Sequence, residues 1–290
     1  MGMTNLQPNL EGKVALVSGA SRGIGKALAL ALASRGCAVS VLAKSEQERE
    51  NLPGTIHQTV AEIETAGGRG LAIKCNVRHA EEVELAVSRT HEEFGRIDFV
   101  VNNAGALWMK PLVQTPLKKF DLLVDVNVRG PFALARLAAE HMMVQGDGGH
   151  ILNIAPPVDL ALLPGRTPYL ITKYGMAMLA HGLAGELAPH KIAANNLWPA
   201  TAVESQATIN HQLGTRENWR TPAILCDAML ALFGHNKGEI SGRDLVDEDW
   251  LRECGVEDFS VYSCVPGGRP LYIHGPKAVA AWEAMGGAGK

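Results

Sequence analysis

Tyr169 and Lys173 are the residues of this sequence whose types and spacing most directly suggest chemistry. They stand four residues apart in "YLITK" (169–173), so on a helix they lie on the same face, one turn from each other. A phenol can donate a proton to a developing alkoxide if a nearby cation lowers its pKa, which is about 10 when unperturbed. The pair is therefore a candidate general acid, with Lys173 as the group that lowers its pKa. The same spacing also occurs by chance on helix surfaces.

A glycine-rich turn lies near the start of the chain, in "LVSGASRGIGKALALALASRG" (16–36). Gly19, Gly23 and Gly25 fall between a predicted strand and a predicted helix. Glycine permits a tight turn and lets the main chain approach a pyrophosphate, while the helix start offers free amides and its positive end. This context predicts dinucleotide binding, and the alternative is a purely structural turn.

The end of the second predicted strand bears on which dinucleotide binds. It reads "VSVLAKSE" (39–46), with Ala43 where NAD-binding proteins of this architecture carry an acid. A carboxylate there would repel a 2′-phosphate, whereas Lys44 and Arg22 supply cations that can pair with it. The sequence favours NADP(H) over NAD(H), although both cations could be ordinary solvated surface charges.

Short apolar runs alternate with helical patterns from residue 13 to about 200, and these elements must position the residues above. Apolar strands joined by amphipathic helices predict a parallel sheet covered on both faces, and right-handed crossovers make it a doubly wound α/β fold. Ligands of such sheets lie outside the carboxyl ends of the strands, where "SGASRGIG", "NNAG" and "NIAPP" all fall. The predicted strands are 13–19, 37–43, 70–77, 97–105, 149–155, 191–199 and 243–247. The predicted helices are 25–36, 57–68, 81–95, 117–145, 168–188 and 221–234.

Two further segments carry open alternatives. Asn127 falls inside the predicted helix 117–145, where an asparagine is mildly unfavourable; it either binds a water, interrupts the helix locally, or is a satisfied polar side chain at a helix contact. The segment 207–220 has few apolar residues between structured elements, so it is either a lid over a substrate or a solvated connector.

Composition narrows the class of protein. At 290 residues, with 47% apolar and 20% charged residues, one large domain is expected. A net charge of -3 argues against nucleic acid or an anionic membrane as a general partner. There is no apolar run of about 18 residues and no signal-peptide pattern, so no membrane span and a cytoplasmic location are expected. Five cysteines without a CxxC pair and ten scattered histidines predict neither a disulfide framework nor a metal site.

Taken together, these residues resemble the short-chain dehydrogenase/reductase family. The matching pieces are "SGASRGIG" (18–25), "NNAG" (102–105), Asn127, Tyr169 with Lys173, and "NLWPAT" (196–201), within about residues 10–250. The resemblance implies a Rossmann fold with a seven-stranded parallel sheet, NAD(P)H chemistry on a small-molecule carbonyl or alcohol, and a homodimer or homotetramer. A single NAD(P)-binding domain is expected over 1–290, with a core of about 10–250 and a C-terminal extension, 251–290.

The resemblance also implies residue roles. The implied catalytic residues are Tyr169, Lys173 and Asn127, the last as support for a water or a proton relay. With the residues argued above, the expected coenzyme contacts are Gly19, Ser21, Arg22, Gly23, Ile24, Gly25, Lys44, Asn76, Val77, Asn103, Ala104, Gly105, Tyr169, Lys173, Pro199 and Thr201. The family's Asp-Val at the adenine appears here as Asn76-Val77, and an amide can still hydrogen-bond adenine.

Longer stretches are similar to the hydroxysteroid dehydrogenase-like subgroup of that family. They are "AKSEQERENLPGTIHQTVAEIE" (43–64), "ILNIAPP" (151–157), "YLITKYGM" (169–176) and "DLVDEDWLRECGVEDFSVY" (244–262). The apolar residues Leu160, Leu162, Leu163 and Trp198 then favour a lipid-like or steroid-like ligand, and core packing explains them equally well.

One departure from the family concerns its catalytic serine, which lies thirteen residues before the tyrosine. Pro156 occupies that position and Ala155 the one beside it, and neither side chain can donate a hydrogen bond. Loss of one such donor costs on the order of 10² to 10³ in turnover. Two hypotheses follow: an NADP(H)-dependent oxidoreductase acting on an apolar carbonyl or secondary alcohol, or a catalytically weak NADP(H)-binding sensor or lipid-binding protein.

Overall fold

Seven strands form one sheet in the computed structural model, which describes residues 6–48, 53–276 and 278. The strand order is β3-β2-β1-β4-β5-β6-β7, and every neighbouring pair is parallel. The strands are β1 (Val14–Ser18), β2 (Ala38–Ala43), β3 (Gly70–Lys74), β4 (Phe99–Asn102), β5 (Gly149–Ile154), β6 (Ile192–Trp198) and β7 (Asp244–Val246). The prediction of a doubly wound, seven-stranded Rossmann sheet is confirmed.

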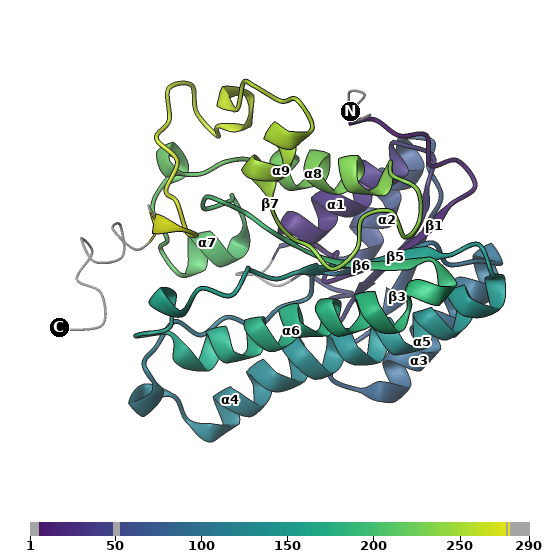
Figure 1. Cartoon of the computed structure of the whole chain (residues 1–290), viewed down its shortest axis with the longest axis horizontal. Coiled ribbons are helices and arrows are strands. Elements are labelled where there is room, and N and C mark those ends of the chain that lie inside the picture. Colours follow the sequence, from purple (N-terminus) through teal and green to yellow (C-terminus); the bar gives the residue numbers. More distant parts are fainter. Residues whose placement is uncertain (1–5, 49–52, 277, 279–290) are drawn as a thin grey trace.

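Helices cover both faces of this sheet, as Figure 1 shows. They are α1 (Gly23–Ala33), α2 (Ile56–Thr65), α3 (Ala80–Phe94), α4 (Leu117–Val124), α5 (Gly130–Gln145), α6 (Thr167–Glu186), α7 (Gln206–Asn210), α8 (Ala223–Phe233) and α9 (Asp247–Glu253). One core cluster joins the sheet to α1, α2, α8 and α9, and a second joins it to α3, α5 and α6. Strands β1, β2, β4 and β5 are buried along their whole length, which explains their continuous apolar sequences.

Two predicted strands are too long at their carboxyl ends. β3 ends at Lys74 and β4 at Asn102, whereas the sequence placed these ends at residues 77 and 105. The additional residues, 75–77 and 103–105, leave the sheet and line a cavity, so their side chains form part of its wall and not part of a strand. Periodicity alone does not distinguish these two uses of the same residues.

The predicted helix 117–145 is helical throughout but not uniform. α4 and α5 are joined by a π-helical segment, η2 (Asp125–Arg129), that contains Asn127. Of the three alternatives for Asn127, two hold together: the helix is locally irregular at this residue, and the side chain is a satisfied polar contact. A π-helical turn widens the helix by one residue, which re-aims the side chain at its centre.

The C-terminal extension folds back onto the loop after β6. Ala202 N–H donates to Leu271 O at 2.7 Å and Ile273 N–H donates to Ala200 O at 2.9 Å, which makes a short antiparallel pairing. The sequence predicted only an extension beyond the core here and no such contact. Within the described ranges, no helix combines the length and the apolar character that a bilayer crossing requires.

Candidate active site

A cavity of about 650 Å³ lies at the carboxyl ends of the strands. The segments that follow β1, β2, β3, β4, β5 and β6 all contribute to its wall, as does the C-terminal extension. The expected coenzyme residues found in the wall are Gly19, Ser21, Arg22, Gly23, Ile24, Gly25, Lys44, Asn76, Val77, Asn103, Ala104, Gly105, Tyr169, Lys173 and Pro199. The convergence of separate loops on one crevice follows from the parallel order of the strands.

The glycine turn has the close backbone approaches that its sequence predicted. Gly19 has φ of +68°, and a Cβ there would lie 2.8 Å from the Cα of Ala104. A Cβ on Gly25 would collide with the Asn103 amide and with the Gly19 carbonyl. The turn thus packs directly against the loop after β4, and a side chain at Gly19 or Gly25 would force the turn and this loop apart.

Basic side chains surround the same end of the cavity. Lys44 is exposed at the end of β2 and makes no hydrogen bond or ion pair with any described residue. Arg22 donates from Nε to Pro53 O and from Nη2 to Gly54 O, both at 2.8 Å, so it also holds the neighbouring loop. Arg78, which the sequence reading missed, follows β3 and donates to Asp125 at 3.3 Å. Three cations therefore lie around the glycine turn, where they favour an anionic ligand.

Two of the residues expected to contact the coenzyme, Asn103 and Thr201, make other contacts in the structure or lie outside the cavity wall. The Asn103 amide donates to Ser18 O at 3.0 Å and to Gly19 O at 3.2 Å, so this side chain supports the glycine turn. Thr201 is fully buried and lies outside the cavity wall, and its hydroxyl has no hydrogen-bond partner among the described residues. Thr201 sits in the pairing with the C-terminal extension, which draws it away from the cavity.

Tyr169 lies in the first turn of α6 and faces the cavity, but its electrostatics differ from the expectation. Burial raises the pKa of its phenol well above the usual value, and Arg166 partly offsets this effect. The sequence predicted a lowered pKa with Lys173 as its cause, and both parts are wrong for this state of the protein. A protonated phenol is nevertheless the form that a proton donor requires.

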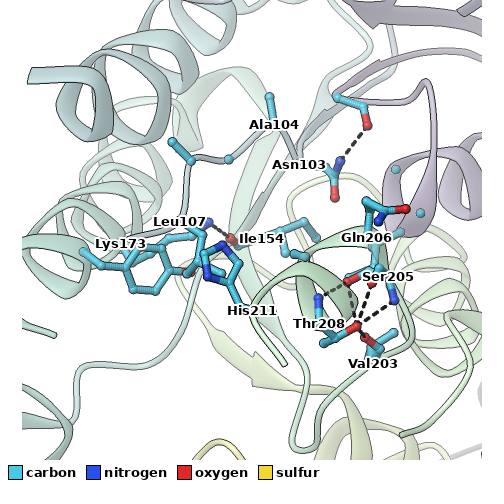
Figure 2. A pocket seen from close by; sticks show the side chains of 18 of the residues that line it. Asn103, Ala104, Leu107, Ile154, Lys173, Val203, Ser205, Gln206, Thr208 and His211 are labelled. Atoms are coloured by element: carbon cyan, nitrogen blue, oxygen red, sulfur yellow. Dashed lines mark hydrogen bonds between the residues drawn. The ribbon is translucent and has the colours of Figure 1, made fainter. Parts of the chain in front are cut away.

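Lys173 is held beside the end of β5. Its Nζ donates to Ile154 O at 2.6 Å (Figure 2). The same Nζ lies 5.5 Å from the centre of the Trp198 ring. Burial lowers the pKa of Lys173 to about 7. Because this value is close to neutral pH, the amine can gain or lose a proton under ordinary conditions.

Asn127 lies behind the cavity wall and not in it. Its side chain is fully buried, accepts from Ala106 N–H at 2.8 Å, and donates to Ala106 O at 3.0 Å and to the Thr172 hydroxyl at 2.9 Å. The Thr172 hydroxyl in turn donates to Tyr169 O at 2.7 Å. Asn127 therefore ties the loop after β4 to the helix turn that carries Tyr169.

The position of the missing serine is occupied by a proline that faces the cavity. Pro156 is buried and part of the wall, whereas Ala155 packs against Met176 and Ala177. Thr167 does not supply a substitute hydroxyl, because it donates to Leu163 O at 3.0 Å. Asp159 lies outside the wall and accepts from Ala161 N–H.

The expected lid divides into two halves. Residues 207, 208, 210, 211 and 213 of the segment 207–220 line the cavity, as do Ser205 and Gln206 just before it. Ser205 lies against Gly23, where a Cβ would be 3.6 Å from the Ser205 Cβ. Ser205 and Thr208 cap each other at the start of α7, and Thr208 donates to Val203 O at 2.9 Å (Figure 2). The second half instead contacts the C-terminal extension, since Leu271 N–H donates to Asn218 O at 2.9 Å.

The substrate half of the wall contains both expected and unexpected residues. Leu162 and Trp198 line it, whereas Leu160 is exposed and Leu163 packs beside it. Arg166 and His274 also line the cavity and were not predicted. Arg166 stands three residues before Tyr169, a spacing that could have identified it, but His274 reaches the site only through the folding of the extension. Among the described residues, no group of three or more His, Cys, Asp or Glu side chains is placed to hold a metal ion.

Comparisons with known proteins agree with this geometry. The family model for short chain dehydrogenase matches residues 13–214. Hydroxysteroid dehydrogenase-like protein 2 of Danio rerio is 40% identical over 267 residues, which cover 90% of this chain and 63% of that protein. This chain thus spans just under two thirds of the curated relative that it matches.

Two solved dehydrogenase structures are also similar to this chain. A putative dehydrogenase from Xanthomonas campestris is 38% identical and superposes with a TM-score of 0.85, covering 91% of this chain and 97% of that one. A short chain dehydrogenase from Mycobacterium thermoresistibile is 41% identical, with a TM-score of 0.84 over 91% of this chain and 94% of that one.

Proposed function

Because this chain belongs to the short-chain dehydrogenase family, and within it to the hydroxysteroid dehydrogenase-like subgroup, we propose that it is an NADP(H)-dependent oxidoreductase. It interconverts a carbonyl and a secondary alcohol on an apolar small molecule. One observation carries this proposal: the glycine cradle with its basic side chains and the Tyr169–Lys173 pair line the same cavity.

The roles of the residues follow from their surroundings. A bound reduced nicotinamide coenzyme would supply the hydride. Tyr169, kept protonated by burial, donates its phenol proton to the substrate oxygen as charge develops there. Lys173, with a pKa lowered to about 7, resupplies that proton near neutral pH. Asn127 holds the loop and the helix turn in register.

The choice of NADP(H) rests on the cations around the glycine turn. A metagenomic relative that is 28% identical was solved in complex with NADP, and a 7 alpha-hydroxysteroid dehydrogenase that is 25% identical was solved with NADH and 7-oxo glycochenodeoxycholic acid. Both coenzymes thus occur among similar structures. Lys44, with no partner among the described residues, supports the phosphorylated coenzyme in this chain.

One observation favours the alternative function, a catalytically weak NADP(H)-binding sensor or lipid-binding protein. Pro156 presents neither a hydroxyl nor an N–H to the place where the family serine would hold the substrate oxygen. A protein that binds NADP(H) and a lipid without rapid turnover would tolerate that loss. Tyr169 and Lys173 are the residues such a protein would not need to retain.

Oxidation of NADPH across a panel of apolar ketones separates these two functions. We expect turnover that falls by about 10² to 10⁴-fold in Tyr169→Phe, since that is the usual contribution of a general acid, while NADPH binding is retained. Tyr262→Phe removes a phenol outside the cavity and is expected to keep its activity. Tight NADPH binding without turnover of any ketone by the unaltered protein would instead support the sensor.

We also propose that the core and its C-terminal extension form a single domain, because Leu271 and Ile273 pair with the loop after β6.

Exposed apolar side chains on α5 and α6, namely Phe132, Ile171 and Met178, support a homodimer or homotetramer, which light scattering would test. A cytoplasmic location is supported by cysteines that form no disulfide with one another in the described ranges.

A further inference from the structure

Lys173 is a buried amine without a carboxylate beside it. Its exposed fraction is 4%, and its Nζ donates to Ile154 O at 2.6 Å and to the Met176 sulfur at 3.6 Å. In the part of the chain that the structure describes, no Asp or Glu lines the cavity wall, and no charged group of another element shifts the pKa of Lys173. A carbonyl and a thioether offset only part of the cost of burying a charge.

Trp198 presents an aromatic face to this amine. The Lys173 Nζ lies over the Trp198 ring, 5.5 Å from its centre. A cation within about 6 Å of a ring centre is attracted by the negative charge of the ring face, and tryptophan attracts it most strongly among the aromatic side chains. The attraction is larger where water is excluded. The ring therefore acts on Lys173 in the direction opposite to burial and favours the charged amine.

The sheet holds the indole in this position. Trp198 is the last residue of β6 and pairs with Val246 of β7. Side chains alternate along a strand, so Trp198 lies on the same side of β6 as Asn196. That side faces α6, because Asn196 Nδ2 donates to Ala177 O at 3.1 Å. Lys173 lies one turn before Ala177 on α6, so the strand and the helix bring the ring and the amine together.

The carbonyl that binds Lys173 comes from the neighbouring strand in matching register. Ile154 ends β5 and pairs with Leu197, the residue before Trp198. The Lys173 Nζ thus contacts the ends of two adjacent strands, through the Ile154 carbonyl (Figure 2) and through the Trp198 ring. Ile154 and Trp198 both line the cavity, as does Tyr169. The ring therefore acts on the amine at the edge of the sheet where the proposed reaction takes place.

We propose that Trp198 is a positioning residue of this site, whose ring face favours the ammonium form of Lys173 and holds its Nζ beside the end of β5. Trp198 itself transfers no proton. In the proposed reduction, the ammonium form resupplies the proton to Tyr169, so a ring that favours this form extends the reaction to higher pH. This consequence rests on the proposed function, whereas the effect of the ring on Lys173 does not depend on it.

The protonation of Lys173 can be measured directly by NMR. With lysine labelled with ¹³C at Cε, the Cε chemical shift is followed against pH, and the Lys173 signal is the one absent from Lys173→Met. In Trp198→Leu, the pKa of Lys173 should fall by about 0.4 to 1.5, the worth of a cation–π contact. Trp198→Phe, which keeps a weaker ring, should give a smaller fall. The Tyr169 phenol does not titrate in this range, because burial raises its pKa. An unchanged or raised pKa of Lys173 in Trp198→Leu overturns the inference.

Fluorinated tryptophan separates the charge of the ring face from the size of the side chain. Protein produced with 5,7-difluorotryptophan keeps the indole shape but carries less negative charge on the ring face. The pKa of Lys173 should again fall, by less than in Trp198→Leu. The same labelling of Trp198→Phe is the matched control and should leave the pKa of Lys173 unchanged. An unchanged pKa in the labelled protein that retains Trp198 overturns the inference, and this result does not require Trp198→Leu to fold.

The pH dependence of kcat for NADPH oxidation tests the consequence for the reaction. Reduction should slow as the pH rises through the pKa of Lys173, and in Trp198→Leu this decline should move to lower pH by the amount that NMR measures. A shifted pKa of Lys173 without turnover of any ketone still supports the effect of the ring, and then only the proposed reaction fails. A decline that stays in place while the pKa of Lys173 falls overturns the claim that Trp198 acts on the reaction through Lys173.

Discussion

Pro156 is the residue at which this site departs most from its family. It faces the cavity, lacks any donor, and follows the Ile154 carbonyl that holds Lys173. The neighbouring Ala155 points into a small core with Met176. In the proposed reaction, the substrate oxygen would meet Tyr169 without a second fixed donor from this loop, and the barrier to reaction would be higher by the value of that bond.

Restoring the hydroxyl is therefore expected to raise activity. Pro156→Ser should increase kcat by about 10- to 100-fold on the best ketone of the panel, toward the value of one oxyanion donor. NADPH affinity should be unchanged, because the new hydroxyl faces the substrate. The matched control is Pro157→Ser, which relaxes the same turn but lies outside the cavity wall. Equal effects of the two substitutions, or no gain with Pro156→Ser, would contradict this role.

At this scale the sequence identified residues by type and spacing, and missed those whose role depends on distant folding. Tyr169 and Lys173 were predictable because a four-residue spacing fixes a shared helix face. Arg78 and His274 were not, since nothing local distinguishes them from ordinary surface residues. The direction of the Tyr169 pKa shift was also missed, because desolvation depends on the whole surrounding wall and not on one neighbour.

Among the elements, the junction of β1 and α1 depends on the absence of side chains. Gly25 lies inside α1, where glycine is normally unfavourable, yet a Cβ there would collide with Asn103 and Gly19. Gly185 also lies inside a helix, α6, but has nothing within 4 Å of its Cβ position. Close packing thus requires glycine at position 25, whereas nothing in the surroundings of position 185 requires it.

Replacing each by alanine should give opposite results. Gly25→Ala should weaken NADPH binding by at least about tenfold and destabilise the fold by about 1 to 3 kcal/mol, as overpacking does. Gly185→Ala should keep NADPH affinity and stabilise the fold by up to about 1 kcal/mol. Fluorescence titration and urea unfolding measure the two quantities. If Gly25→Ala bound NADPH normally, the glycine turn would not be the phosphate cradle.

The elements themselves were largely predictable, because buried parallel strands and amphipathic helices have distinct periods. The exceptions have physical causes. The π-helical segment around Asn127 is stabilised by hydrogen bonds to Ala106 and Thr172, residues that only the tertiary structure brings together. The edge of the cavity formed by Leu271 and Ile273 follows from a three-residue pairing too short to leave a pattern in the sequence.

On the scale of the whole molecule, stability and function are separated across the sheet. The cavity lies at the carboxyl ends of the strands, while a buried ionic cluster around Asp98 lies at the amino ends, where it pairs with Arg96 and Lys237. His150, near the start of β5, is buried in contact with Phe99 and Phe233 beside this cluster. Burial and the charge of Lys237 lower the pKa of His150 to about 4.

This shift predicts a loss of stability in mild acid. The folded pKa of His150 lies below the unfolded value of about 6.5, so its contribution is complete above pH 6.5 and is lost as the pH falls toward 4. Between pH 7.5 and 5, the protein should lose about 2 kcal/mol more unfolding free energy than His150→Leu does. Asp98 does not contribute in this window, because its pKa is lowered from 3.8. Burial raises the pKa of Asp247 to about 7. Because the unaltered protein and His150→Leu both contain Asp247, its titration cancels in the difference between them.

Urea unfolding at the two pH values measures this difference. His190→Gln, which changes an exposed histidine, should behave as the unaltered protein does. Identical pH dependence in the unaltered protein and His150→Leu would show that His150 is not the group that titrates.

The most direct measurement of the central claim is isothermal titration of NADPH and NADH into the protein. We expect NADPH to bind more tightly than NADH by about tenfold, the worth of one charge-assisted contact to the 2′-phosphate. Lys44→Glu should abolish that preference, while Lys118→Glu, an exposed lysine outside the cavity, should retain it. Heat from neither nucleotide, or tighter binding of NADH, would contradict a cavity built for a phosphorylated dinucleotide.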